Sequence, residues 1–203
     1  PRRHTYRILF LPETIGALVW LSRRRLAEEC ARAALRKMCH ISDGAVLPAI
    51  IAGYQVVCCG DERRYSFLPS RKNHTLADRA AKTAFKNLDF MFGWEPWDSQ
   101  SLGDPKKVAI WSYLDRGSDE RQWCAPGIDL PVASIMRSKY GEYPEYHTSL
   151  DDLSFISQKG MEGSLAVYQR AIEIIEVNLF YKATKLGEAF LSKYGLYTHS
   201  SND

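Results

Sequence analysis

The sequence lacks any run of about 18 apolar residues, the length that a helix needs to cross a bilayer. Its first residues, 1–5, lack the apolar stretch of a secretory signal. A strong charge of one sign is also missing, because 27 basic residues stand against 24 acidic ones and leave a net charge of +3. We therefore expect neither a membrane nor a nucleic acid as a partner. Internal repeats and low-complexity tracts are absent.

Cysteines are few and do not form a recognisable framework. There are five, an odd number, at no repeated spacing. Cys58 and Cys59 are adjacent, so they cannot form a Cys-x-x-Cys zinc or redox pair. Buried free thiols are typical of a reducing compartment, which indicates a cytoplasmic protein. At 203 residues, the chain is long enough for one domain with a sizeable core.

What the sequence does contain is an alternation of strand-like and helix-like segments, which predicts an α/β fold. Thr75 is a suitable N-cap for a helix over 76–87. The long apolar segment 49–59 is expected to be a buried strand, because parallel strands are buried on both faces. Further strands are expected over residues 5–11, 65–71, 108–113 and 131–136, and further helices from 17, over 26–38 and over 162–185.

Two carboxylates follow predicted strands directly. Glu13 lies in a turn between the strand 5–11 and the next helix, and Asp61 follows the strand 49–59. The carboxyl edge of a parallel sheet is where α/β proteins place their active sites, so both are candidate functional residues. The alternatives are that Glu13 only favours the positive end of a helix and that Asp61 only stabilises a Gly-Asp turn.

The segment 117–156 gathers the largest number of reactive side chains. His147 follows the predicted strand 131–136 and precedes Asp151 and Asp152. A neutral imidazole is a good zinc ligand, and nearby carboxylates can orient it through its second nitrogen. The spacing is therefore compatible with a metal site. It is equally compatible with a surface histidine in a loop that aspartates cap.

The same segment supplies candidates for substrate binding and catalysis. The planar guanidinium of Arg121 matches the geometry of a substrate carboxylate, and Asp119 and Glu120 beside it complete a candidate substrate-binding group. The alternative for Arg121 is an internal Arg–Asp pair. Tyr146 is a candidate to donate its phenol proton to an oxyanion, with packing beside the histidine as the alternative.

Three of these segments resemble one superfamily. The octapeptide Tyr146-His-Thr-Ser-Leu-Asp-Asp-Leu153 resembles the Tyr-His-Thr-x-x-Asp-Thr/Asp-Leu segment of di-zinc aminopeptidases of the bacterial leucyl-aminopeptidase type. The whole run 117–156 resembles the aminopeptidase-like domain proteins of bacteria and archaea, a branch of the same superfamily. The heptapeptide Phe10-Leu-Pro-Glu-Thr-Ile-Gly16 resembles their Pro-Glu-Thr-Ile-Gly turn.

The resemblance implies a three-layer α/β/α sandwich with a mostly parallel central sheet, and a zinc-dependent hydrolase that acts on a peptide or amide bond. It implies one or two zinc ions, with Asp61 and His147 among the ligands. Glu13 would be the general base, and Tyr146 would assist at the oxyanion. Thr14 stands where the superfamily has a second glutamate that binds metal, and it is a poor zinc ligand.

The resemblance also implies that residues 1–203 are a single, N-terminally truncated domain. The superfamily's first histidine and its bridging aspartate would lie upstream of the segment that begins at Thr5. Residues 98–114 have no counterpart, so they are either an insertion or an error in the gene model. A non-catalytic peptide- or sugar-binding domain on the same scaffold is the alternative function. The sequence leaves open the identity of the substrate and the oligomeric state.

Overall fold

The structure is a computed structural model, and it describes residues 2–26, 50–88, 91–93, 107–179, 187 and 190–196. Of residues 91–93 and 107, only the main chain is described. The helix expected over 26–38 lies outside the described residues, apart from its first residue. Residues 98–106 of the expected insertion lie outside them as well.

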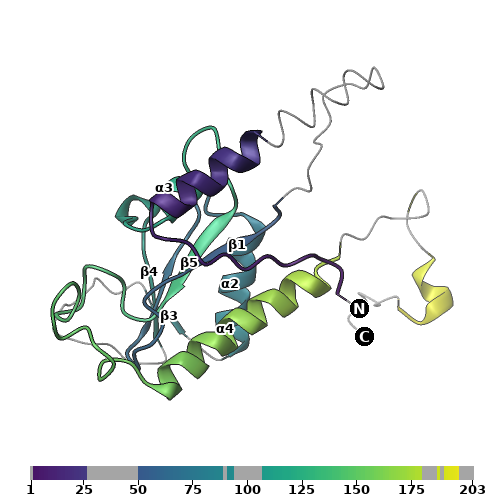
Figure 1. The fold of residues 1–203 in the computed structure, drawn as a ribbon. Helices are drawn as coiled ribbons and strands as arrows, with labels where there is room; N and C mark the ends of the chain where they lie inside the picture. The colour runs from purple at the N-terminus through teal and green to yellow at the C-terminus, as the bar shows by residue number, and fades with distance from the viewer. Residues whose placement is uncertain are drawn as a thin grey trace.

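The described residues form a mixed α/β fold around one five-stranded sheet (Figure 1). The sheet order is β1-β5-β2-β4-β3. Three of the four pairings are parallel, whereas β2 and β5 run antiparallel, with Ser66 opposite Met136. The α/β class is therefore as expected, but the sheet is mixed. The strands are β1 (Gly53–Val56), β2 (Tyr65–Leu68), β3 (Met91–Gly93), β4 (Lys107–Ile110) and β5 (Val132–Met136).

One face of the sheet is covered by two helices, α2 (Leu76–Asn87) and α4 (Gln158–Val177). Successive residues of a strand point to opposite faces, so Ala133 and Ile135 of β5 reach this side. They pack into a buried cluster with side chains of β2, α2 and α4. The Tyr168 hydroxyl of α4 donates a hydrogen bond of 2.6 Å to the carbonyl oxygen of Ile135, which fixes the helix on the sheet.

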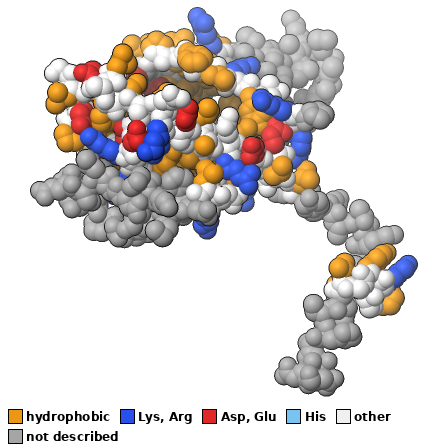
Figure 2. Space-filling view, turned by 90° about the horizontal axis from the view of Figure 1, so that it is seen from below, with side chains coloured by type: hydrophobic (Ala, Val, Ile, Leu, Met, Phe, Trp, Pro, Cys, Tyr) orange, Lys and Arg blue, Asp and Glu red, His pale blue; other side chains and the backbone are white. Residues whose placement is uncertain are grey.

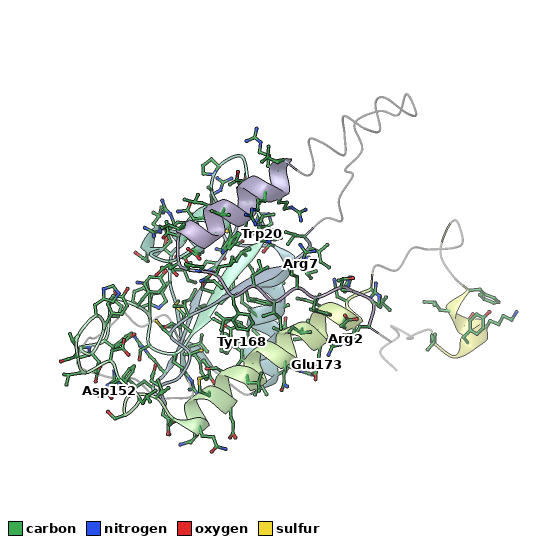
Figure 3. The ribbon with its side chains drawn as sticks, in the orientation of Figure 1. Arg2, Arg7, Trp20, Asp152, Tyr168 and Glu173 are labelled. Carbon is green, nitrogen blue, oxygen red and sulfur yellow. The ribbon has the colours of Figure 1, made fainter. Side chains whose placement is uncertain are left out.

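The opposite face carries the helix over residues 15–26 and the short α3 (Glu120–Trp123). Val132 of β5 packs here with Ala17 and Trp123. The Trp20 and Trp123 rings meet edge to face, with their centroids 5.6 Å apart. Figure 3 shows Trp20 and Tyr168 on different helices to either side of the sheet.

Several predicted elements are confirmed. β5 coincides with the expected strand 131–136, and all five of its residues are buried. The helix α2 has the predicted bounds, and Thr75 caps it in a capping box with Asp78. α4 begins at Gln158, four residues earlier than expected, because Ser157 accepts the hydrogen bond of Gly160 N–H as N-cap. The helix ends at Val177, where Asn178 is the extended C-cap, so the expected end at 185 is wrong.

The strand predicted over residues 5–11 is wrong, because this segment is extended but pairs with no described strand. Ile8 is 79% exposed and Phe10 is 92% exposed. The segment is instead anchored on α4, where the Tyr6 hydroxyl donates a hydrogen bond to Glu176 and the backbone N–H of Arg3, just before the segment, donates another of 2.7 Å. A high strand propensity means only that side chains would fit a pleated, half-buried surface. The described residues offer this segment no neighbouring strand to form such a surface.

The expected long central strand over 49–59 is also corrected. β1 covers only residues 53–56 and lies at the edge of the sheet, where Val56 is 59% exposed. Cys58 has φ +48°, a left-handed conformation that cannot continue a ladder. Residues 107–110, expected to belong to an insertion, form β4 between β2 and β3, and Val108 is fully buried there.

The surface of the described residues mixes both charges, as the near-neutral composition predicts. In Figure 2, basic and acidic side chains alternate on the face seen, with hydrophobic side chains between them. None of the described helices is long and apolar enough to cross a membrane.

Candidate functional site

Glu13 projects from a tight turn that leads into the helix over 15–26. The Gly16 N–H donates to the carbonyl oxygen of Pro12 at 2.9 Å, and Thr14 adopts φ +61°. A Cβ at Gly16 would lie 2.7 Å from Cβ of Leu11, so only glycine fits this turn. The turn leaves the Glu13 side chain exposed.

Two residues just before α3 hold this turn in place. The Ser118 hydroxyl donates a hydrogen bond of 2.9 Å to Oε1 of Glu13. Oδ1 of Asp119 accepts the backbone N–H of Thr14 at 2.6 Å. Burial raises the pKa of Asp119; the Thr14 N–H opposes this shift and the negative charge of Glu13 adds to it. Asp119 is only 4% exposed, so it holds the Glu13 turn from the buried side.

Glu120 is fully buried and organises the loop that carries Ser118. Its Oε1 accepts hydrogen bonds from the backbone N–H groups of Gly117 and Ser118 at 2.7 and 2.9 Å, and from the hydroxyl of Tyr140 at 2.6 Å. Burial, and next the bond to Glu120, raise the pKa of Tyr140. Within the described part of the chain, Oε2 has no hydrogen-bond partner. Glu120 thus lies inside the loop and away from solvent.

Arg121 bonds to the same two segments. Its Nε donates to the carbonyl oxygen of Ser118 at 3.0 Å, and Nη2 donates to the Thr14 hydroxyl at 3.4 Å. No described carboxylate lies within ion-pair distance of its guanidinium, and the residue is exposed. The guanidinium is therefore next to the Glu13 turn and outside ion-pair distance of the described carboxylates.

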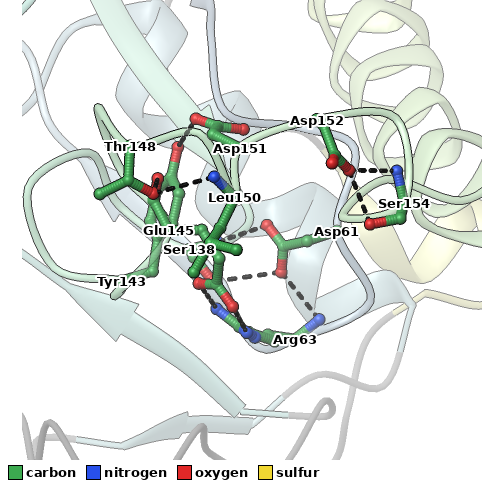
Figure 4. A network of polar contacts seen from close by, with 10 residues as sticks. All are labelled: Asp61, Arg63, Ser138, Tyr143, Glu145, Thr148, Leu150, Asp151, Asp152 and Ser154. Carbon is green, nitrogen blue, oxygen red and sulfur yellow. Dashed lines mark hydrogen bonds and ion pairs between the residues drawn. The ribbon is translucent and has the colours of Figure 1, made fainter.

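Asp61 is buried in the turn after β1, where three hydrogen bonds engage its carboxylate (Figure 4). Oδ1 accepts from the Arg63 N–H at 2.9 Å and from the Ser138 hydroxyl at 3.1 Å. Oδ2 accepts from the Ser138 N–H at 3.1 Å. The N-terminal end of α4 packs closely against this turn, since a Cβ added at Gly160 would lie 2.1 Å from the carbonyl oxygen of Gly60.

His147 is exposed and has φ +56°, an unusual conformation for a non-glycine residue. Its ring stacks on Tyr146, with centroids 3.9 Å apart and an interplanar angle of 14°. Tyr146 in turn packs against the buried cluster of Leu68, Met136 and Tyr140. Burial raises the pKa of Tyr146, and the neighbouring groups Cys58, Glu13 and Asp151 raise it further.

Two cavities lie beside the Asp61 turn. The first has a volume of about 450 Å³ and a polar wall, in which Arg63 and Glu145 form an ion pair of 2.7 Å. The second has a volume of about 320 Å³ and a more apolar wall. Asp61 and Phe155 border both cavities. The second cavity is lined by Cys58, Cys59, Gly60, Asp61, Tyr143, Asp151, Phe155, Ile156 and Met161.

The described residues do not by themselves make a zinc site. Nowhere among them do three or more His, Cys, Asp or Glu side chains converge on a position for one ion. The carboxylate of Asp61 already accepts hydrogen bonds from Arg63 and Ser138, and the His147 ring stacks on Tyr146. A zinc ion bound by protein alone needs three or four ligands, so these two residues would need partners from outside the described ranges.

Residues 1–178 match the protein family described as "Domain of unknown function (DUF4910)". The chain belongs to this family. A curated relative from Clostridium acetobutylicum, named "Putative polysaccharide biosynthesis protein with aminopeptidase-like domain", is 31% identical over 196 residues. These residues are 96% of this chain and 37% of the relative, so the chain spans little more than a third of that protein.

A crystal structure of a "putative peptidase" from Clostridium acetobutylicum has a similar fold, with a TM-score of 0.66 and 27% sequence identity. The match covers 95% of this chain and 37% of the solved one. The DUF4910 chain is therefore similar to proteins named as peptidase-like and aminopeptidase-like. The expected resemblance holds at this level, and membership of the di-zinc superfamily remains a prediction.

The structure joins Asp119 and Arg121 to the turn that carries Glu13, whereas it places Tyr146 against His147 and Tyr143. It adds Ser118, the hydrogen-bond donor to Glu13, and Tyr143, whose hydroxyl donates to Asp151 at 3.3 Å. Neither residue is predicted from the sequence, because serine and tyrosine are common and their partners lie far away in the chain or across a loop. The only available signal for Ser118 was its place between Gly117 and Asp119 in a segment rich in charged residues.

Proposed function

We propose that this DUF4910 chain is part of an aminopeptidase-like hydrolase that cleaves a peptide or amide bond. The observation that carries the proposal is the exposed Glu13 carboxylate, which a tight turn presents and the Ser118 hydroxyl orients. A general base needs this combination of a fixed position and access to water. The peptidase-like names of the two relatives support the same reaction class.

In this proposal, Glu13 accepts a proton from the attacking water, and the hydroxyl of Tyr146 donates a hydrogen bond to the oxyanion that develops on the carbonyl. Arg121 binds a substrate carboxylate, since no described acidic group pairs with its guanidinium. Asp119 and Glu120 affect substrate binding indirectly, because they hold the loop that carries Ser118 and the Glu13 turn in place. A three-layer, mostly parallel zinc-peptidase-like sandwich and a cytoplasmic location are part of the proposal.

The proposal includes one or two zinc ions, with Asp61 and His147 as ligands. Because the described residues offer no third ligand, the remaining ligands would come from other parts of the polypeptide. The relatives are much longer than this chain, which leaves room for such ligands. Asp61 would also have to give up a hydrogen bond from Ser138 or Arg63 to bind metal.

The test combines elemental analysis with an aminopeptidase assay on leucine p-nitroanilide, using this chain and a longer polypeptide that includes upstream sequence. We expect zinc in the longer form, a loss of zinc in His147→Ala and Asp61→Ala, and retained zinc without hydrolysis in Glu13→Gln. Glu173→Gln, an exposed change on α4, is the control and should alter neither property. Zinc-free protein without hydrolysis in both forms would refute the proposal.

The second candidate is a non-catalytic domain that binds a peptide or a sugar. Thr14 at a ligand position and the fully engaged carboxylate of Asp61 favour it. Such a domain would contain no stoichiometric zinc, and its ligand affinity would be the same in the wild type and in Glu13→Gln.

A further inference from the structure

Two adjacent cysteines line the second cavity. Successive residues of a strand point to opposite faces, so neighbouring side chains normally diverge. Cys58 departs from this rule, because its φ of +48° is left-handed and turns the chain just past β1. Cys58 and Cys59 therefore border the same cavity, and neither is in a disulfide. Sγ of Cys58 lies 3.7 Å from the hydroxyl of Tyr143, which belongs to the same wall.

A third sulfur atom borders this cavity. Met161 of α4 lines it, and its Sδ lies 3.4 Å from the position that a Cβ on Gly60 would occupy. Because Gly60 directly follows Cys59, the thioether lies beside the two thiols. Met161 is 49% exposed and both cysteines are partly exposed, so an ion from solvent can reach the cavity. Two segments that are distant in the sequence thus bring three sulfur donors together.

The backbone that carries the two thiols is held in place. The carbonyl oxygen of Cys58 accepts the N–H of Arg137 at 2.8 Å. The carbonyl oxygen of Cys59 accepts the hydroxyl of Ser164 at 2.7 Å. A set of ligands whose backbone is already fixed loses little conformational entropy when an ion binds.

The adjacency of the two thiols disfavours a disulfide between them. Neighbouring Cα atoms are about 3.8 Å apart across a trans peptide. Disulfides usually join Cα atoms that are about 4.4–6.8 Å apart, so a bond between adjacent residues needs distorted geometry. The pair is therefore better suited to remain reduced and to bind a ligand through both sulfur atoms.

The donor types decide which kind of ion fits. Thiolate and thioether ligands favour soft ions such as Cu(I). Zinc needs three or four protein ligands, and within the described ranges no third His, Cys, Asp or Glu joins the two thiols. Burial raises the pKa of Cys58 and of Cys59, so an ion must displace their protons in order to bind. This cost also favours an ion with a strong preference for sulfur.

We propose that Cys58, Cys59 and Met161 bind one soft monovalent metal ion, Cu(I), in the second cavity. The two cysteines bind as thiolates and release their protons to solvent, and the Met161 thioether completes a three-sulfur site. Because Met161 belongs to the first turn of α4, the ion would link this helix to the segment that follows β1. The site uses neither Glu13 nor His147, so it does not depend on the proposed hydrolase.

Competition for Cu(I) tests the proposal on the reduced chain under anaerobic conditions. The Cu(I) complex of bathocuproine disulfonate loses its visible absorbance as the protein takes the ion, and we expect one ion per chain. Cys58→Ser and Cys59→Ser should each bind at least about 100-fold more weakly, a larger loss than most changes outside the ligand shell cause. Met161→Leu, which preserves the volume of the wall, should bind about tenfold more weakly because only the thioether is lost.

The matched control is the double variant Cys30→Ser/Cys39→Ser, which removes the two cysteines outside the described residues. It should bind one Cu(I) with the affinity of the wild type. Circular dichroism of every variant separates the loss of the site from the loss of the fold. Wild-type affinity in Cys58→Ser or Cys59→Ser, or lost binding in the control, would overturn the proposal.

A second measurement uses the wild type, so it does not depend on how the variants fold. The protein is labelled with ¹³C at the methyl groups of its four methionines and titrated with Ag(I), which shares the preference of Cu(I) for sulfur. One methyl signal should shift, and it should be the signal that is missing from Met161→Leu. If no methionine signal moves with one Ag(I) per chain, the three-sulfur site is wrong.

The copper site and the proposed zinc site can be told apart. His147→Ala should lose zinc in the longer polypeptide and still bind Cu(I) as the wild type does. A Cu(I) affinity that falls at least tenfold in His147→Ala would place the ion at the zinc site and contradict the proposal.

Discussion

The Ser118 hydroxyl donates a 2.9 Å hydrogen bond to Oε1 of Glu13, across 105 residues of sequence. The same two segments meet again where the Thr14 N–H donates to Asp119. Two adjacent bonds thus fix the position and the orientation of the Glu13 turn. Since Glu120 holds the loop that carries Ser118, the buried carboxylate sets the geometry of the exposed one.

Ser118→Ala removes the donor to Glu13 and leaves the rest of the loop in place. We expect the free energy of unfolding to fall by about 0.5–1.5 kcal/mol, the usual net contribution of one hydrogen bond. If Glu13 is the general base, kcat should fall by about fivefold with KM little changed, because the bond orients a group that acts in the transition state. Urea unfolding and steady-state kinetics measure the two effects.

Ser154→Ala is the control for this prediction, because it also removes a hydroxyl donor to a carboxylate, that of Asp152, at an exposed position. It should leave kcat unchanged. An equal effect of both serine changes on kcat would show that Ser118 does not act through Glu13.

The sequence predicted best where local rules and burial agree. Thr75 with Asp78 three residues later marks the start of α2, and the apolar run 131–136 is a strand buried on both faces. It failed for residues 5–11, because propensity does not say whether a neighbouring strand is available. The same limit applies to 49–59, where the apolar run continues past Val56 but the left-handed Cys58 ends the strand.

For the candidate site, sequence patterns identified the chemically reactive residues but not the residues that form hydrogen bonds with them. Glu13 and Asp61 are marked by charge beside proline or glycine, and Arg121 by its place in the charged run 119–121. Ser118 and Tyr143 acquire their roles only through contacts across many residues, which no local pattern encodes. Likewise, nothing in the spacing shows that Ser138 occupies the oxygens of Asp61.

Gly160→Ala should distort the Asp61 turn. The added Cβ would lie 2.1 Å from the carbonyl oxygen of Gly60 and 2.6 Å from that of Asp61, and both are backbone atoms that cannot rotate away. We expect a loss of about 1–3 kcal/mol or more of unfolding free energy, as for other overpacked positions. Chemical-shift changes should centre on residues 59–62.

Lys159→Ala, one residue earlier on α4, is the matched control. Lys159 is exposed and forms only a surface ion pair with Glu62, so its loss should cost less than about 1 kcal/mol. A similar cost for both alanines would mean that α4 does not pack closely on the Asp61 turn.

Phe85→Ala and Phe10→Ala should separate the core from the unpaired N-terminal segment. Phe85 is fully buried, and its ring meets Tyr65 edge to face at 5.4 Å, so truncation should cost about 3–5 kcal/mol. Phe10 is 92% exposed, so its truncation should change the stability of this chain by less than about 0.5 kcal/mol. A large loss on Phe10→Ala, measured by urea unfolding, would show that the segment 5–11 is packed in solution.

Asp119 and Asp152 should give stability differences with opposite dependence on pH. Burial raises the pKa of Asp119, so the fold favours its protonated form. Its contribution to stability is complete below the pKa of the unfolded chain and is lost as the pH rises through the folded pKa. Asp119→Asn retains an acceptor for Thr14 N–H but does not titrate. The variant should therefore gain stability relative to the wild type as the pH rises from about 3 to about 6.

The hydrogen bonds from the Ser154 hydroxyl and N–H lower the pKa of Asp152, so the fold favours its charged form. Its contribution is present above the unfolded pKa and is lost as the pH falls through the folded pKa. Asp152→Asn should therefore lose stability relative to the wild type over the same rise in pH. Thermal unfolding at intervals between pH 3 and pH 7 measures both trends. Parallel trends would mean that Asp119 is not buried as the structure places it, and that solvent reaches the base of the Glu13 turn.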